Sequence, residues 1–182
     1  DRATRQLLNF IVYDKTGKYS TAWAYDILQD RKGRIWMASY QGGIFVMEKQ
    51  RLVAAIAHAA SGTATCVADY HFSDKGQNAL SGLHVGQMVL DSKGMIWASS
   101  HDHLDRIDPY TMRVAHIGGN DAINYLMASG NGNVWVGYNA SVKCYMVNLP
   151  MKGKEVDSKE WKIGDKVGTV DQLDFDYSGR SE

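Results

Sequence analysis

Short apolar segments separated by polar turns run along the whole chain. One pattern recurs: an apolar segment, then Asp-x-x-Gly, then x-apolar-Trp followed by small residues. Three full copies centre on Gly33, Gly94 and Gly132, and a partial fourth copy centres on Gly179. Apolar segments of this length between glycine-containing turns are typical of β-strands. Only Leu52–Ala60 also fits a helix, so the pattern predicts an all-β chain.

The spacing of the copies predicts the architecture. The successive steps between these glycines are 61 residues from Gly33 to Gly94, 38 from Gly94 to Gly132 and 47 from Gly132 to Gly179. Two of these steps fit the repeat of about 40–50 residues of a four-stranded propeller blade, and the longest indicates an insertion. We therefore expect a β-propeller segment of four-stranded antiparallel blades, with about three full blades plus partial blades in an incomplete ring.

The repeats also predict where the strands lie. The expected innermost strands are 24–29, 86–90, 123–128 and 170–175, and the Trp-bearing strands are 34–39, 95–100 and 133–138. Third strands are expected at 43–47, 104–107 and 142–147, and fourth strands at 52–57, 113–117 and 160–163. Residues 5–13 are expected to be an outer strand of a preceding blade. The predicted organisation is one propeller fragment: 1–20 ends a blade, 21–60, 83–121 and 122–167 are blades, 61–82 is an insertion, and 168–182 starts a further blade.

Each residue type in the repeat has a predicted structural role. The glycines Gly33, Gly94, Gly132 and Gly179 allow the positive φ of a tight turn. The aspartates Asp30, Asp91 and Asp176 can accept backbone N–H bonds within that turn. The indoles of Trp36, Trp97 and Trp135 are expected to fill the space between neighbouring blades, because blades stack face to face.

Charge and cysteine content narrow the function. Twenty basic and twenty acidic residues give a net charge of zero, so nothing favours a nucleic acid as partner. No apolar run reaches the roughly 20 residues of a membrane span. Cys66 and Cys144 form no metal-binding spacing. We expect two separate thiols, although a single bridge stays open.

Candidate ligand-binding residues gather on one face of the expected propeller. The loops after the Trp strands contain aromatic, amide, imidazole and carboxylate side chains: Tyr40, Gln41, His101, Asp102, His103, Tyr138 and Asn139. Trp23, Tyr25 and the 59–82 segment should lie beside them. Such groups suit the CH faces and hydroxyls of a sugar, whereas the alternative is a set of solvated loop residues. His101 and His103 would share one side of an extended strand, but no third ligand follows by spacing, so neither a metal nor another cofactor is expected.

The repeat resembles the two-component regulator propeller repeat. Asp30, Gly33, Ile35, Trp36 and Gly42-Gly43-Ile44 match that family's pattern, as do Asp91, Gly94, Ile96, Trp97 and Asp108-Pro109. The third copy departs at Ser129 and at Ala140-Ser141. The resemblance implies a periplasmic sensor of a hybrid two-component system. Its parent would be a membrane-anchored histidine kinase that controls transcription of polysaccharide-use genes.

Three functions remain to be compared. The first is a sensor portion that binds an oligosaccharide or another small ligand and packs against the remaining blades of a dimeric parent. The second is a propeller enzyme of the sialidase or lyase type. Sialidase repeats have one residue between Asp and Gly, whereas this chain has two, and no acid pair or catalytic residue can be assigned. The third is a protein-interaction or dimerisation scaffold.

Overall fold

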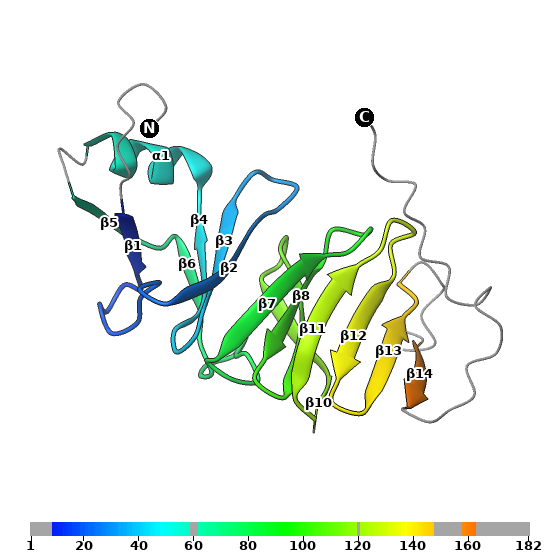
Figure 1. The fold of residues 1–182 in the computed structure, drawn as a ribbon. Helices are drawn as coiled ribbons and strands as arrows, with labels where there is room; N and C mark the ends of the chain where they lie inside the picture. The colour runs from blue at the N-terminus through cyan, green and yellow to red at the C-terminus, as the bar shows by residue number, and fades with distance from the viewer. Residues whose placement is uncertain (1–8, 59–61, 120, 148–157, 163–182) are drawn as a thin grey trace.

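Three four-stranded antiparallel sheets lie side by side in chain order (Figure 1). The computed structural model describes residues 9–58, 62–119, 121–147 and 158–162. The first sheet contains β2 (Ala24–Gln29), β3 (Ile35–Ser39), β4 (Gly43–Met47) and β6 (Tyr70–Phe72). The second contains β7 (Val85–Leu90), β8 (Ile96–Ser100), β9 (His103–Asp108) and β10 (Arg113–Gly119). The third contains β11 (Ile123–Ala128), β12 (Val134–Tyr138), β13 (Ser141–Tyr145) and β14 (Ser158–Lys162).

This arrangement confirms the predicted fold, a segment of β-propeller in which each sheet is one blade. The innermost strands β2, β7 and β11 are neighbours, and each sheet runs outward from its innermost strand in chain order. The described strands form no closed ring. The expected strand at 170–175, together with Asp176 and Gly179, lies outside the described residues, as do residues 5–8 of the expected outer strand. No described helix is both long and apolar enough to span a bilayer.

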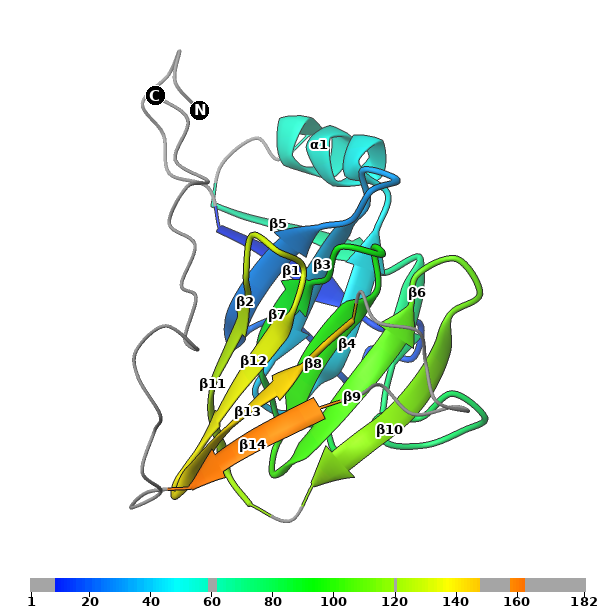
Figure 2. The same ribbon diagram turned by 90° about the vertical axis from the view of Figure 1, so that its right-hand side faces the viewer.

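The prediction of a fourth strand at 52–57 is wrong. Residues Lys49–His58 form α1, which lies at one end of the molecule over β1 (Asn9–Tyr13) and β5 (Thr63–Val67) (Figure 2). Leu52 and Ile56 are four residues apart and lie on one helix face, which packs on the first blade. The edge of β4 is instead paired by β6, which lies within the predicted 61–82 insertion. The first blade therefore extends past residue 60, and the inserted part is α1 with β5, between its third and fourth strands.

The turn of each of the first two repeats is organised by a buried aspartate. Oδ1 of Asp30 accepts the backbone N–H groups of Lys32 and Arg34, both at 2.9 Å, and Oδ2 accepts the Trp36 indole N–H at 2.9 Å. Asp91 repeats these contacts with Lys93, Met95 and Trp97. The glycines of the three turns, Gly33, Gly94 and Gly132, have φ of 83°, 81° and 86°, as predicted.

The indoles fill the junctions between blades. Trp36 has no exposed surface and lies in a core with Val85, Met88 and Ile96 of the second blade. Trp97 is equally buried and packs with Leu126 and the third blade. The predicted role of these two side chains is thus confirmed. Trp135 is only half-buried and stacks on Trp161 of its own blade, with ring centroids 5.6 Å apart.

A repeated hydrogen bond also joins the innermost strands. Each innermost strand contains a bulge near its start, and a bulge takes backbone groups out of the strand ladder. The side chain of Asp26 accepts the N–H of Met88 at 2.7 Å, and that of Gln87 accepts the N–H of Leu126 at 2.8 Å. Asp26 and Gln87 stand at the same position of their repeats. The first and second blades therefore each supply the acceptor for a backbone donor in the next blade.

The opposite face of the first blade is covered by β1 together with the inserted α1. Met37, Phe45 and Met47 of this blade are fully buried under Val12 of β1 and Leu52 of α1. β1 pairs with β5 in parallel, with Val12 opposite Cys66. Both cysteines are free, and burial raises the pKa of the Cys144 thiol to about 11.

Replacement of the turn aspartate should be costly and sensitive to pH. Burial opposes ionisation of Asp30, but the Trp36 and Arg34 hydrogen bonds outweigh it and hold the pKa of this carboxyl below its ordinary value. Asp30→Asn should lower the free energy of unfolding by about 2 kcal/mol at pH 7, because a buried carboxylate with four donors is replaced by an amide. The ionised carboxylate stabilises the fold above about pH 4 and loses this effect as pH falls through the lowered pKa, so the two proteins should converge in acid.

Urea unfolding of both proteins between pH 3 and pH 8 would measure this difference. Asp74→Asn changes an exposed aspartate in the same way and should leave the free energy of unfolding within about 0.5 kcal/mol of the starting value. Equal stability of Asp30→Asn and the unaltered protein at pH 7 would show that the turn does not depend on the carboxylate.

Removal of an inter-blade acceptor should also destabilise the fold. Gln87→Ala leaves the Leu126 N–H without its acceptor at a partly buried junction. The expected loss is about 1–3 kcal/mol in the free energy of unfolding, since an unpaired buried donor carries its full desolvation cost. Gln77→Ala in an exposed loop is the matched control. Identical denaturation midpoints for both variants would contradict the role of Gln87.

Candidate functional site

The repeat places equivalent residues at one end of neighbouring blades. Trp23 and His84 each stand thirteen residues before the Trp of their repeat, and Tyr40 and His101 each stand four residues after it. The backbone N–H of Tyr40 donates to the Trp23 carbonyl at 3.0 Å, and that of His101 donates to the His84 carbonyl at 2.7 Å. These bonds tie the loop that enters each blade to the loop between its second and third strands.

Aromatic rings of these loops form one surface. Tyr40 lies at the centre, with ring centroids 4.1 Å from His84, 5.3 Å from Tyr25 and 5.9 Å from Trp23. His101 continues the surface, 5.9 Å from His84. We call these five residues the aromatic cluster. Trp23 is 62% exposed and Tyr25 is 55% exposed, so the cluster presents large apolar faces to solvent.

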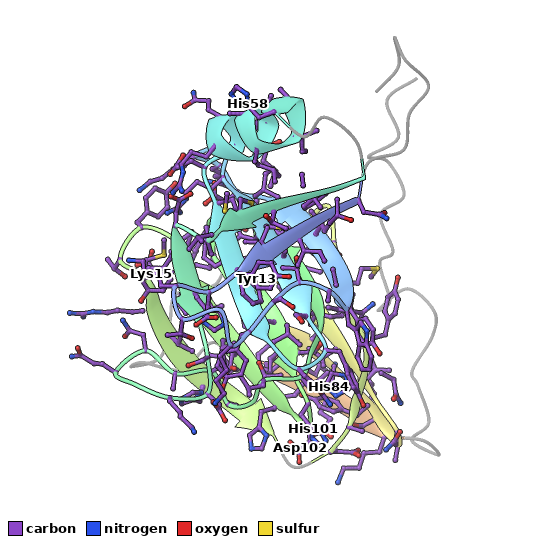
Figure 3. All side chains as sticks on the ribbon, turned by 90° about the vertical axis from the view of Figure 1, so that its left-hand side faces the viewer. Tyr13, Lys15, His58, His84, His101 and Asp102 are labelled. Atoms are coloured by element: carbon purple, nitrogen blue, oxygen red, sulfur yellow. The ribbon has the colours of Figure 1, made fainter. Side chains whose placement is uncertain are left out.

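Figure 3 shows where this site lies. His84, His101 and Asp102 gather at one end of the molecule, and His58 of α1 lies at the other. The cluster therefore occupies the end predicted from the loops, and it combines residues from the first and second blades. The inserted α1 takes no part in it.

The electrostatics of the cluster favour a neutral imidazole at its centre. Burial and the nearby charge of His101 both lower the pKa of His84 below its ordinary value. His84 is consequently uncharged near pH 7. A neutral imidazole offers one hydrogen-bond donor and one acceptor, so it can bind a hydroxyl group in either sense.

A short chain of contacts joins His101, Asp102 and His103. Asp102 Oδ1 lies 3.1 Å from His101 Nδ1 and 2.6 Å from His103 Nδ1. His101 has a φ of 61° and precedes β9, so the extended geometry expected for both imidazoles is not adopted. The described residues contain no group of three or more metal-binding side chains. Asp102 instead orients both rings.

Of the other predicted residues, Gln41 borders the cluster, and Tyr138 and Asn139 lie in the third blade. Gln41 lines a cavity of about 330 Å³ with Tyr19 and Trp23, next to the cluster. Tyr138 lines a different cavity of about 230 Å³ in the third blade. Asn139 binds within its own blade, donating to Asp121 at 3.1 Å and accepting from Asn124 at 2.8 Å. The predicted face is therefore divided into separate regions.

A serine, a histidine and an aspartate also meet on the outer part of the second blade. Nδ1 of His116 lies 2.7 Å from Asp105 Oδ1 and 2.8 Å from Ser81 Oγ. In a catalytic triad the aspartate and the nucleophile contact different ring nitrogens. Here Asp105 and Ser81 both contact the same ring nitrogen. The arrangement therefore anchors the loop around Ser81 to β9 and does not activate the serine.

His84 is the residue of the aromatic cluster that motif analysis missed. It precedes the strand β7 and lies outside the Asp-x-x-Gly-x-x-Trp pattern. Its signal is positional: alignment of the repeats on their tryptophans places it at the same position as Trp23. Comparison of the repeats column by column would have found it.

The geometry can now be compared with known proteins. Residues 18–41 match the family model described as two component regulator propeller. No curated protein matches the chain.

Solved structures with a similar fold include two of the extracellular domain of BT4673 from B. thetaiotaomicron. One is described as a candidate one component system and the other as a candidate hybrid two component system. They are 29% identical to this chain, with TM-scores of 0.73 and 0.72, and they cover 90% of it. This chain spans only 21% of each of those chains.

A more distant structure supports the fold alone. It is the extracellular domain of BT3049 from the same organism, described as a candidate hybrid two component system. Its sequence identity to this chain is 17% and its TM-score is 0.53. The match covers 78% of this chain and 17% of that one. Together, these comparisons confirm the resemblance of the repeats to the two-component regulator propeller, the family whose pattern the first blade of this chain carries.

Proposed function

We propose that this chain is the ligand-sensing part of a hybrid two-component signal-transduction protein, and that its aromatic cluster binds an oligosaccharide. The carrying observation is the exposure of Trp23 and Tyr25 around Tyr40 and His84, since a contiguous patch of exposed apolar rings commonly marks a binding site. Ring faces pack against the CH faces of a sugar, and the imidazoles and carboxylate beside them bind its hydroxyls.

The location and signalling role extend the same proposal. The similar structures are extracellular domains, so we place this portion in the periplasm and its parent in the inner membrane. The parent would contain the histidine kinase and control transcription of polysaccharide-use genes. This portion itself acts by binding. The His116 arrangement does not fit a triad, because Asp105 and Ser81 contact the same ring nitrogen.

Further blades are part of the proposal. Tyr125 and Val142 of the third blade are 59% and 43% exposed, and Trp135 is only half-buried, whereas Trp36 and Trp97 are fully buried by a following blade. The third blade thus offers the face on which a following blade would pack. Residues 168–182 carry the start of a further repeat and are proposed to begin that blade.

Binding should depend on the central rings of the cluster. Isothermal titration of a panel of plant and host oligosaccharides should find a ligand, and Trp23→Ala or Tyr40→Ala should weaken its affinity about tenfold or more through the loss of ring contacts. Tyr110→Ala removes an exposed ring from a turn at the other end of the second blade and should leave the affinity unchanged. A panel without any binder would overturn the proposal, as would turnover of a glycan by the protein.

Oligomeric state is tested separately. We expect the intact periplasmic region to form a homodimer, measured by light scattering with and without the ligand found above. A monomer at micromolar concentration under both conditions would contradict the dimeric part of the proposal and leave the binding site in place.

A further inference from the structure

The two junctions between blades differ at one repeat position. The residue eleven places before the repeat tryptophan is Tyr25 in the first blade and Gly86 in the second. In the first junction the ring of Tyr25 lies against both Tyr40 of its own blade and His84 of the next, with centroid distances of 5.3 and 5.9 Å. In the second junction no side chain stands at this place.

A cavity occupies the corresponding place in the second junction. Its volume is about 210 Å³, and its lining is His84, Gly86, Ser99, His101, Ala122 and Ile123. Ala122 stands where the preceding repeats have Trp23 and His84. The second junction therefore lacks a large side chain at two positions, that of Gly86 and that of Ala122. A Cβ added to Gly86 would meet only the Ser99 hydroxyl, at 3.4 Å. Because the φ of Gly86 is not positive, the backbone does not require glycine here.

The first junction shows what this space accommodates. A six-membered ring, that of Tyr25, lies at the equivalent position against an aromatic residue and an imidazole. The cavity is smaller than the roughly 300–1,000 Å³ of sites that enclose a whole drug-sized ligand. It therefore suits one ring of a longer molecule, with the rest outside.

The lining selects the chemistry of that ring. His84 is uncharged near pH 7, and His101 presents a second imidazole, with its ring centroid 5.9 Å from that of His84. Ala122 and Ile123 provide a small apolar wall. Two imidazoles at the rim and an apolar wall suit a ring with apolar faces and a hydroxylated edge.

We propose that the Gly86 cavity binds one pyranose ring of the ligand, at the place equivalent to that of the Tyr25 side chain in the preceding junction. This inference rests on the proposed function and adds a subsite to it. The ring in the cavity lies beside His84, and the rest of the oligosaccharide extends across the aromatic cluster toward Tyr40 and Trp23. The absence of a side chain at Gly86 then determines how deeply the ligand enters.

The test restores the missing side chain. Gly86→Tyr gives the second blade the residue that the first blade carries at this position, and it should fill the cavity. Gln29→Tyr is the control, because it introduces the same side chain at an exposed position at the far end of an innermost strand. Thermal unfolding of both variants checks that they fold, and the smaller change Gly86→Ser keeps the test valid where Gly86→Tyr does not fold.

Two readouts separate this subsite from the site as a whole. The first is the affinity of the best oligosaccharide, measured by calorimetry. The second is the shift of the His84 and His101 ring signals in NMR spectra during titration with methyl pyranosides of glucose, galactose and mannose at millimolar concentration. We expect one of these pyranosides to shift both signals in the unaltered protein. Gly86→Tyr should abolish the shift and weaken oligosaccharide affinity at least tenfold, and Gly86→Ser should weaken it to a smaller extent, while Gln29→Tyr changes neither.

Contradictory results distinguish the two proposals. Oligosaccharide binding that depends on Trp23 but is unaffected by Gly86→Tyr and Gly86→Ser would overturn the subsite alone. The subsite would also be overturned if no methyl pyranoside shifts the imidazole signals. Absence of any glycan binding in the unaltered protein would overturn both the subsite and the proposed function.

Discussion

The turn, the direction of the indole and the junction between blades all depend on the hydrogen bonds of the buried aspartate in the repeat turn. In the first two blades one carboxylate binds two backbone N–H groups of the turn and the indole N–H of the Trp strand. It thereby fixes the turn and the direction of the indole together. The indole then fills the junction with the next blade. In the third repeat Ser129 stands in place of the aspartate and its hydroxyl stays within the turn, where it contacts Asn131 and Asn133. There the Trp135 indole packs on its own blade.

The same regularity produces the candidate site. Since the blades repeat in register, equivalent loop positions from neighbouring blades come together at one end of the molecule. The first two blades place aromatic and imidazole side chains at these positions, and the third places Ala122 and Asn139 there. The surface therefore changes from aromatic to small and polar along the arc. That gradient, on a scaffold tied by the Asp26 and Gln87 bonds, is the basis for the proposal that a ligand stacks on the aromatic rings and enters the Gly86 cavity.

Several features could be predicted from the sequence because each depends on local chemistry. Positive φ at Gly33, carboxylate capping by Asp30 and burial of Trp36 all follow from the repeat itself. The fourth strand of the first blade could not be found in this way. Residues 52–57 are apolar enough for a strand, but Leu52 and Ile56 pack as one face of a helix on the first blade, and the short β6 carries too few residues for a clear pattern. His84 was missed because its importance comes from Tyr25 and Tyr40 of another blade, a contact between distant segments.

The central claim is that a glycan binds across the junctions of the first, second and third blades. A crystal structure of the protein with a bound oligosaccharide tests this most directly. The account predicts sugar rings stacked on Trp23 and Tyr40, with one ring beside His84 above Gly86. A ligand bound elsewhere, with this surface bare in the same crystal, would contradict it.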